Sequence, residues 1–303
     1  MATVRRAAMN FSSFLIRSFL GILILGMLLV AACDPQTDQT VEGDYGDAIV
    51  MSADGVPIAY EDNGEGSPAL VLVHGWSSDR RYWSEQVGPL SVEHRVVTID
   101  LGGHGESGLG RGSWTIASFG ADVAAVVEHL GLDSVVLIGH SMGGDVIFQA
   151  ARILPGKVDA LVMVDTYKQL DVIRSDADID EIVAQFSADF PVVTEKFVRS
   201  FFPANADPAL VDWVATDMAS APPHVGLSAI RSSFQHAREI PNLIRELKVP
   251  ILAINPDDAP TDFDSMNKYE VKVKIMRDVG HFLMMEDPIR FNSLLLEAVD
   301  EVQ

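Results

Sequence analysis

Short apolar runs recur along the chain from residue 48 onward and alternate with stretches of helical periodicity. The runs are rich in β-branched residues and end at turn residues, which is typical of strands buried in a parallel sheet. They lie at residues 48–51, 56–60, 69–73, 95–99, 134–138, 160–164, 250–254 and 271–276. The dipeptide Asp54-Gly55 between the first two runs predicts an antiparallel hairpin.

The stretches between the later runs predict helices. Residues 116–130 carry apolar side chains at helical spacing and stop at Gly131, and a last helix is expected over 288–302. Repeated strand–helix units after an antiparallel start predict an α/β domain, whose mostly parallel sheet is flanked by helices on both faces. Residues 166–247 break this rhythm with aromatic residues, prolines and no strand pattern. We expect this insertion to form a helical cap over the carboxyl ends of the strands.

The five residues Gly139-His140-Ser141-Met142-Gly143 lie between a predicted strand and a predicted helix. A G-x-S-x-G sequence in that setting is typical of a nucleophile elbow, a tight turn that holds a serine hydroxyl out of the sheet. The serine also lies at the N-terminus of a helix, whose dipole favours developing negative charge. Ser141 is therefore the candidate nucleophile.

The N-terminus has the features of an export signal. Arginines precede the apolar stretch 19–30, and small residues lead to Cys33, the only cysteine of the chain. The sequence Val30-Ala31-Ala32-Cys33 resembles the bacterial lipobox, which implies diacylation of Cys33. We expect a lipoprotein signal peptide over 1–32, an acidic tether over 33–47, and a protein held at the membrane of the bacterial cell envelope, facing away from the cytoplasm. A plain signal peptide or an uncleaved anchor is the alternative.

Net charge and cysteine content limit the kinds of partner and of covalent cross-link that are expected. The formal net charge of −21 disfavours nucleic acid and anionic lipid surfaces as partners. A single cysteine excludes a disulfide framework. Residues 48–303 are enough for one α/β domain. No phosphate-binding loop or Cys/His cluster indicates a metal or cofactor, and the oligomeric state is left open.

Four segments together carry a family resemblance: residues 72–76, 100–108, the elbow, and 280–282. With them, the chain from 48 to 302 resembles an α/β-hydrolase-fold enzyme. The resemblance implies an eight-stranded sheet and a serine hydrolase without metal or cofactor, which cleaves a small, fairly apolar ester through an acyl-enzyme. A lactonase, a serine perhydrolase or a C–C hydrolase of the same fold is the alternative, and a non-catalytic ligand-binding lipoprotein is an alternative of another class.

The remaining site residues follow from these segments. His281 comes after the last predicted strand and is the expected base, because the fold brings that loop back over the sheet. The backbone N–H groups of Trp76 and Met142 are the expected oxyanion donors, and His74 is expected to brace its loop.

The acid that orients the base is less clearly marked. Counting from the end of the strand at 250–254 favours Asp258, although the glycine usual in this loop is missing. Asp257 is adjacent, and Asp165 follows the preceding strand. All three stay open as the acid.

Overall fold

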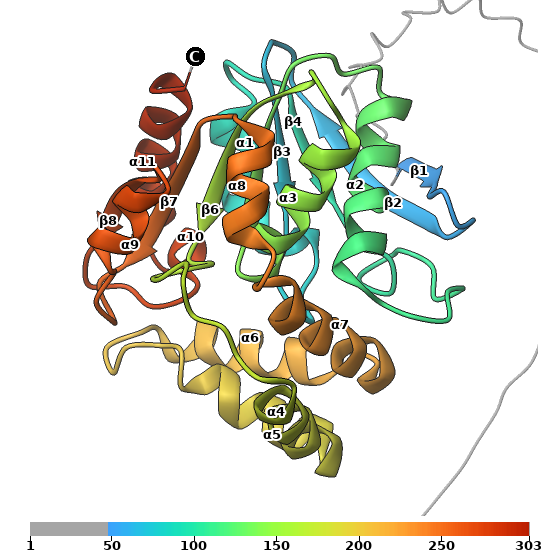
Figure 1. The fold of residues 1–303 in the computed structure, drawn as a ribbon, viewed down its shortest axis with the longest axis vertical. Helices are drawn as coiled ribbons and strands as arrows, with labels where there is room; N and C mark the ends of the chain where they lie inside the picture. Colours follow the sequence, from blue (N-terminus) through green and yellow to red (C-terminus); the bar gives the residue numbers. More distant parts are fainter. Residues whose placement is uncertain (1–47, 303) are drawn as a thin grey trace, which may run out of the picture. The chain divides into compact units, whose positions relative to one another are not determined.

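The computed structural model describes residues 48–302. Eight strands form one sheet in the order β1-β2-β4-β3-β5-β6-β7-β8 (Figure 1). β2 pairs antiparallel with β1 and β4, and all other neighbours pair in parallel, which confirms the predicted fold class. The strands are β1 (Ala48–Met51), β2 (Pro57–Asn63), β3 (Ala69–Val73), β4 (Val96–Ile99), β5 (Val135–His140), β6 (Val158–Val164), β7 (Ile251–Pro256) and β8 (Lys272–Met276).

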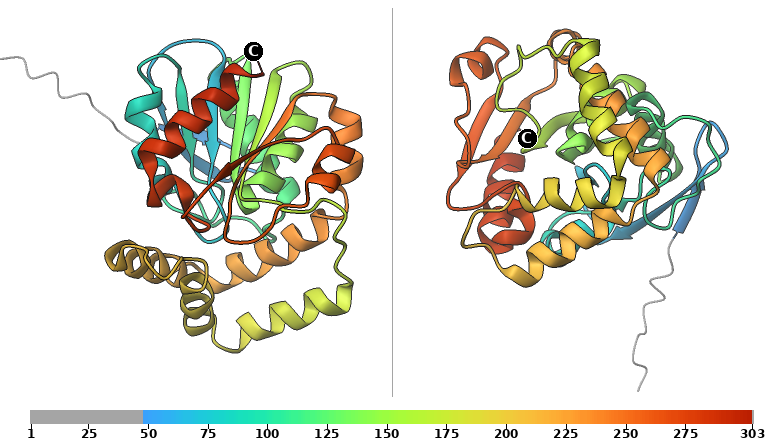
Figure 2. Two further views of the ribbon diagram at one scale, coloured as in Figure 1. Left: turned by 90° about the vertical axis from the view of Figure 1, so that its left-hand side faces the viewer. Right: turned by 90° about the horizontal axis from the view of Figure 1, so that it is seen from below.

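Helices cover both faces of the sheet (Figures 1 and 2). One layer holds α2 (Ile116–His129), α3 (Met142–Ile153) and α8 (Ile240–Leu247), with α3 packed between the other two. The opposite layer holds α1 (Ser84–Leu90) and α11 (Pro288–Asp300), which pack against each other. Three short helices lie in the connections: η1 (Arg80–Trp83), α9 (Phe263–Lys268) and α10 (Leu283–Glu286).

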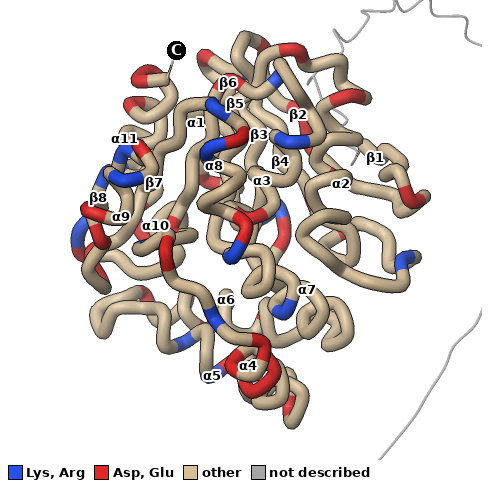
Figure 3. Tube along the Cα trace, in the orientation of Figure 1, with Lys and Arg blue, Asp and Glu red and all other residues tan. Residues whose placement is uncertain are grey.

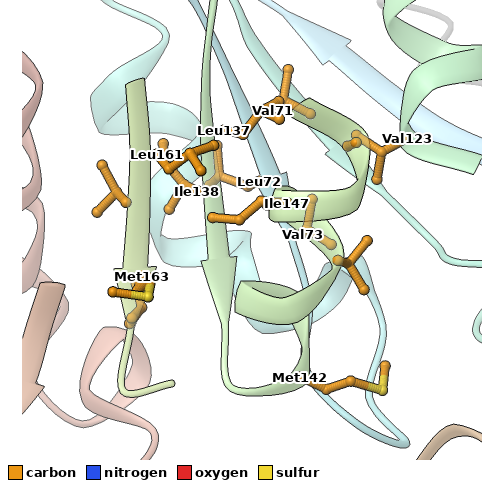
Figure 4. Close-up of a cluster of buried hydrophobic side chains, with 14 of the residues drawn as sticks. Val71, Leu72, Val73, Val123, Leu137, Ile138, Met142, Ile147, Leu161 and Met163 are labelled. Carbon is orange, nitrogen blue, oxygen red and sulfur yellow. The ribbon is translucent and has the colours of Figure 1, made fainter. Parts of the chain in front are cut away.

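The core lies on the central strands. Every residue of β3 and β5 is buried, because helices cover both sides of these strands and leave no face for polar side chains. Figure 4 shows side chains from both strands meeting those of the flanking helices, for example Leu72 and Ile138 beside Ile147 of α3. This packing fixes the strand ends from which the functional loops leave.

The insertion between β6 and β7 forms a cap at the carboxyl ends of the strands (Figures 1 and 2). It consists of α4 (Asp176–Ala188), α5 (Phe190–Arg199), α6 (Pro208–Ala219) and α7 (Pro223–His236). Acidic residues are concentrated in α4 (Figure 3). The last helix of the predicted cap, α8, instead packs on α3 and belongs to a flanking layer, because its buried Ile240, Leu243 and Ile244 form one apolar face.

The predicted signal peptide and tether, residues 1–32 and 33–47, lie outside the described part of the chain. Among residues 48–302, no helix combines the length and the apolar character needed to cross a bilayer.

Candidate active site

Ser141 lies at the sharp turn between β5 and α3, with φ 52° and ψ −119°. The flanking glycines are required by close backbone approaches. A Cβ on Gly139 would lie 2.2 Å from the carbonyl oxygen of Gly143, and a Cβ on Gly143 would lie 2.4 Å from that of Val73. The turn therefore closes only with glycine on both sides, and it holds Ser141 in the strained conformation of a nucleophile elbow.

His281 lies on the loop between β8 and α10, and its partner is Asp165, the first residue after β6. The His281 Nδ1 and Asp165 Oδ2 atoms are 2.6 Å apart. An ionised carboxylate can only accept, so Nδ1 carries the hydrogen and Nε2 is left free as a proton acceptor. Burial opposes the ionisation of Asp165, but the hydrogen bond from His281 and the nearby Lys168 hold the pKa of this carboxyl below its usual value.

The expectation that Asp258 partners His281 is wrong in this structure. β7 runs two residues beyond its predicted end and pairs Pro256 with Met276, so the following loop begins farther along. Asp257 Oδ1 then accepts from the Asp278 N–H at 2.9 Å, and the Asp258 carboxylate contacts Lys168.

Asp165 takes the place beside the base because β6 and β7 are parallel neighbours whose ends meet at one edge of the sheet. Its own N–H donates to Ile254 of β7 at 2.9 Å. Its position directly after an apolar strand next to the elbow strand was the available sequence signal.

The two expected oxyanion donors border the same cavity as Ser141 and His281. Met142 is the first residue of α3, where backbone N–H groups have no partner within the helix. Trp76 lies just beyond β3, and its indole Nε1–H donates to the Gly226 carbonyl of α7 at 2.7 Å. This bond and edge contacts with Phe186 and Phe190 hold the indole against the cap. The loop that carries the Trp76 backbone is therefore held in place by the cap.

His74 braces this loop, as predicted. It is fully buried; its Nδ1–H donates to the Gly75 carbonyl at 2.8 Å, and its Nε2 accepts from the Leu101 N–H at 3.0 Å. Gly75 in turn lies so close to the nucleophile that a Cβ there would be 3.3 Å from the Ser141 Cβ. The loop and the elbow are therefore packed in direct contact.

The cavity has a volume of about 170 Å³. Its wall is mainly apolar and aromatic, formed by Trp76, Met142, Phe197, Phe201, Met218, Ile230, Phe234 and Phe282 together with Gly75, Ser78, His140, Ser141, Ser233 and His281. Within the described part of the chain, no lysine, arginine, aspartate or glutamate lines it. Over the same residues, no group of three or more His, Cys, Asp and Glu side chains is placed to hold a metal ion. The cavity suits a small, uncharged group.

Besides the adjacent Phe282, two rings from other parts of the chain pack against the imidazole of His281. The His140 ring lies 4.6 Å from it between centroids, and the Phe201 ring of the cap lies at 4.7 Å. His140 Nε2–H also donates to the His281 carbonyl at 2.9 Å. Burial lowers the pKa of His140 to about 3, so it stays neutral beside the base. The sequence predicts His140 only as part of the elbow motif, because its contact with His281 joins positions that are far apart in the chain.

A buried polar network joins the cap to α3. Asp145, in the first turn of α3, accepts hydrogen bonds from Tyr167 and from Ser233 of α7, and His236 Nδ1 lies 3.2 Å from it. Gln149 Nε2 reaches His236 Nε2 at 2.6 Å. Ser233 also lines the cavity. The network couples the nucleophile helix to the cap wall, and its members are too far apart in sequence to reveal it.

Comparison with known proteins agrees with this architecture. The family model described as "alpha/beta hydrolase fold" matches residues 68–211. A non-heme chloroperoxidase from Streptomyces lividans is 30% identical over 229 residues, covering 69% of this chain and 81% of that protein. An AB hydrolase superfamily protein from Bacillus subtilis is 26% identical over 267 residues, covering 82% and 97%. The structure of a thermophilic esterase from Thermogutta terrifontis matches with a TM-score of 0.74 and 26% identity, covering 84% and 98%.

A serine on an elbow, a histidine–aspartate pair and a capped apolar cavity at the carboxyl ends of a parallel sheet define the hydrolase class of α/β proteins. The chain belongs to the α/β-hydrolase fold family, and its structural neighbours include esterases.

Proposed function

We propose that the protein is a serine hydrolase that cleaves a small, uncharged carboxylic ester through an acyl-enzyme. The observation that carries the proposal is the meeting of Ser141 and the His281–Asp165 pair at one apolar cavity. A nucleophile, an orienting acid and a base in this chain order are the components of acyl transfer in this fold.

The chemistry follows from the geometry. Ser141 Oγ attacks the ester carbonyl carbon while His281 Nε2 takes the hydroxyl proton, and the Asp165 carboxylate stabilises the imidazolium. The N–H groups of Trp76 and Met142 receive the oxyanion. The C–O bond then breaks, and the alcohol leaves with the proton held by His281. Water, deprotonated by His281, attacks the acyl-enzyme and releases the acid and the free serine.

The size and lining of the cavity limit the size and charge of the substrate group that can enter it. A dry cavity of roughly 150 Å³ in another protein holds benzene, so a cavity of about 170 Å³ accepts a group of similar size. An apolar wall without charged side chains offers no partner for an ionised group, whose desolvation would be uncompensated. We therefore propose a short aliphatic or single-ring group on the side of the ester that enters the cavity.

A panel of p-nitrophenyl esters of increasing acyl length tests the proposal. We expect hydrolysis of the short esters, a steep fall for long chains, and labelling by a fluorophosphonate probe. Ser141→Ala should lower kcat at least about a thousandfold and abolish labelling, whereas Ser78→Ala, at another serine of the cavity wall, should keep labelling. A wild-type protein that neither labels nor turns over any ester would instead support a ligand-binding role.

Perhydrolysis is a second candidate, favoured by the similarity to a protein named as a non-heme chloroperoxidase. In that reaction hydrogen peroxide replaces water as the nucleophile and leaves with the acyl group as a peracid. Peracid formation from a short ester with added peroxide, faster than hydrolysis of the same ester, would favour this function.

We also propose that Cys33 carries a lipid anchor that holds the domain at the bacterial envelope. The support is the sequence alone: an apolar stretch after arginines, small residues before the cysteine, and no other cysteine in the chain. Two acyl chains would hold the domain stably where one chain is marginal.

A further inference from the structure

The second carboxylate oxygen of Asp165 faces a charged pair outside the cavity. Oδ2 binds His281, while Oδ1 lies 3.4 Å from Lys168 Nζ. The same Nζ contacts the carboxylate of Asp258. These contacts form one chain of alternating basic and acidic side chains that leads from the cavity toward solvent: His281, Asp165, Lys168 and Asp258.

The backbone holds this pair in place. The Lys168 carbonyl accepts from the Asp262 N–H at 2.8 Å, and Asp258 Oδ1 accepts from the Ala259 N–H at 2.8 Å. The Lys168 side chain is 22% exposed and that of Asp258 is 38% exposed, against 7% for Asp165. The two loops thus carry a cation and an anion to the outer side of the buried acid.

We infer that Lys168 and Asp258 are positioning residues for the base: together they set the pH range in which His281 is neutral and can accept the proton of Ser141. This inference rests on the proposed function. A cation beside Asp165 weakens the field that favours the imidazolium, and the Asp258 carboxylate offsets part of that cation. The two side chains therefore act on His281 in opposite directions.

Two other titratable side chains lie around His281, namely His140 and Glu286. His140 packs against the ring and is neutral. The Glu286 carboxylate accepts from the N–H groups of Gly280 and Phe282 at 2.9 and 3.2 Å, and burial raises its pKa. Ser141 faces the cavity. The Asp258 carboxylate also raises the pKa of Glu286, so Asp258→Asn acts on His281 both through Lys168 and through Glu286.

The pH profile of kcat/KM tests the inference. Lys168→Met removes the cation and keeps the length of the side chain, so the acid limb should move to higher pH. Asp258→Asn removes the anion that offsets part of the Lys168 charge, so the limb should move to lower pH. For unit charges several ångströms away and partly exposed, each shift is roughly half a pH unit. The double variant should lie between the two, and added salt should shrink both shifts.

Asp257→Asn is the matched control, because Asp257 is the adjacent charge but is bound to the Asp278 N–H instead of Lys168. It should move the limb less than Asp258→Asn. Unmoved limbs, or shifts of equal sign in the two single variants, would overturn the inference. A loss of kcat at every pH without movement of the acid limb would indicate that the pair has only a structural role. That result would also overturn the inference.

A readout without substrate separates this inference from the proposed function. The downfield proton resonance of the His281 Nδ1–H reports the imidazole titration directly. If the wild-type protein turned over no ester, the proposed function would fail, while opposite shifts of this titration midpoint in the two variants would still support the charged pair. If esters are cleaved but the midpoints coincide, the pair alone is refuted.

Discussion

Replacement of Asp165 by asparagine tests the assignment of the acid. The Asp165 carboxylate accepts from His281 Nδ1–H at 2.6 Å and leaves Nε2 free to take a proton. An asparagine amide can turn its N–H toward Nδ1, and the imidazole proton then moves to Nε2, where it blocks proton transfer from Ser141. This is the wrong tautomer for a general base.

The magnitude follows from the loss of both functions of the carboxylate, its control of the tautomer and its charge beside the imidazolium. We expect kcat to fall by about 10⁴, or about 5 kcal/mol of transition-state stabilisation at about 1.36 kcal/mol per tenfold change. The fold should tolerate the change. Asp165 has φ 42°, a conformation that asparagine adopts as readily as aspartate, and Lys168 keeps its contact with Asp258.

The assay is kcat for a short p-nitrophenyl ester on the alkaline plateau of the pH profile, measured together with the melting temperature. Asp258→Asn is the control and should keep kcat within about threefold on that plateau, because a partly exposed charge contributes little once the base is fully neutral. A tenfold loss or less in Asp165→Asn, with a large loss in Asp258→Asn and unchanged melting temperatures, would return the acid to the loop after β7 and refute the reasoning.

Two further predictions concern stability and targeting. Burial lowers the pKa of His104 to about 3, so the unfolded chain binds a proton that the folded chain does not between about pH 3 and 6.5, and stability falls as pH falls through this window. Between pH 7 and pH 5 the free energy of unfolding, measured with urea, should fall by about 2 kcal/mol because of this group. The fall should be smaller in His104→Gln. Equal falls in the two proteins would contradict a buried neutral imidazole at His104. Radiolabelled palmitate should appear on the wild-type protein and vanish in Cys33→Ser. A mature N-terminus other than Cys33, measured by mass spectrometry, would exclude the lipoprotein signal.

The fold and the nucleophile could be predicted from local patterns. Runs of β-branched residues require burial on both faces, so they predicted the parallel strands and their order along the chain. The glycines around Ser141 are needed by contacts within one turn and with the adjacent strand end, so five consecutive residues were enough to locate the elbow. His281 followed from its place after the last strand. Each of these inferences depends on residues close together in sequence or on a motif with one structural solution.

The acid could not be chosen in this way. Three aspartates follow the ends of β6 and β7, and the difference between them is where β7 stops pairing with β8. That end point depends on hydrogen bonds between strands, which no local pattern encodes. The sequence predicts α8 as part of the cap for a similar reason, because its amphipathic pattern does not say which surface its apolar face will cover.

The sequence by itself determined the strands and the elbow, because short-range sterics and burial dictate them, and the family resemblance indicated His281. The tertiary structure alone decided that Asp165 binds His281, that Lys168 lies beside its second oxygen and contacts Asp258, and that Asp145 ties the cap to α3. Those contacts join segments separated by up to 116 residues. Charged and polar groups on such segments find partners only after the sheet register and the cap have brought them within hydrogen-bond distance.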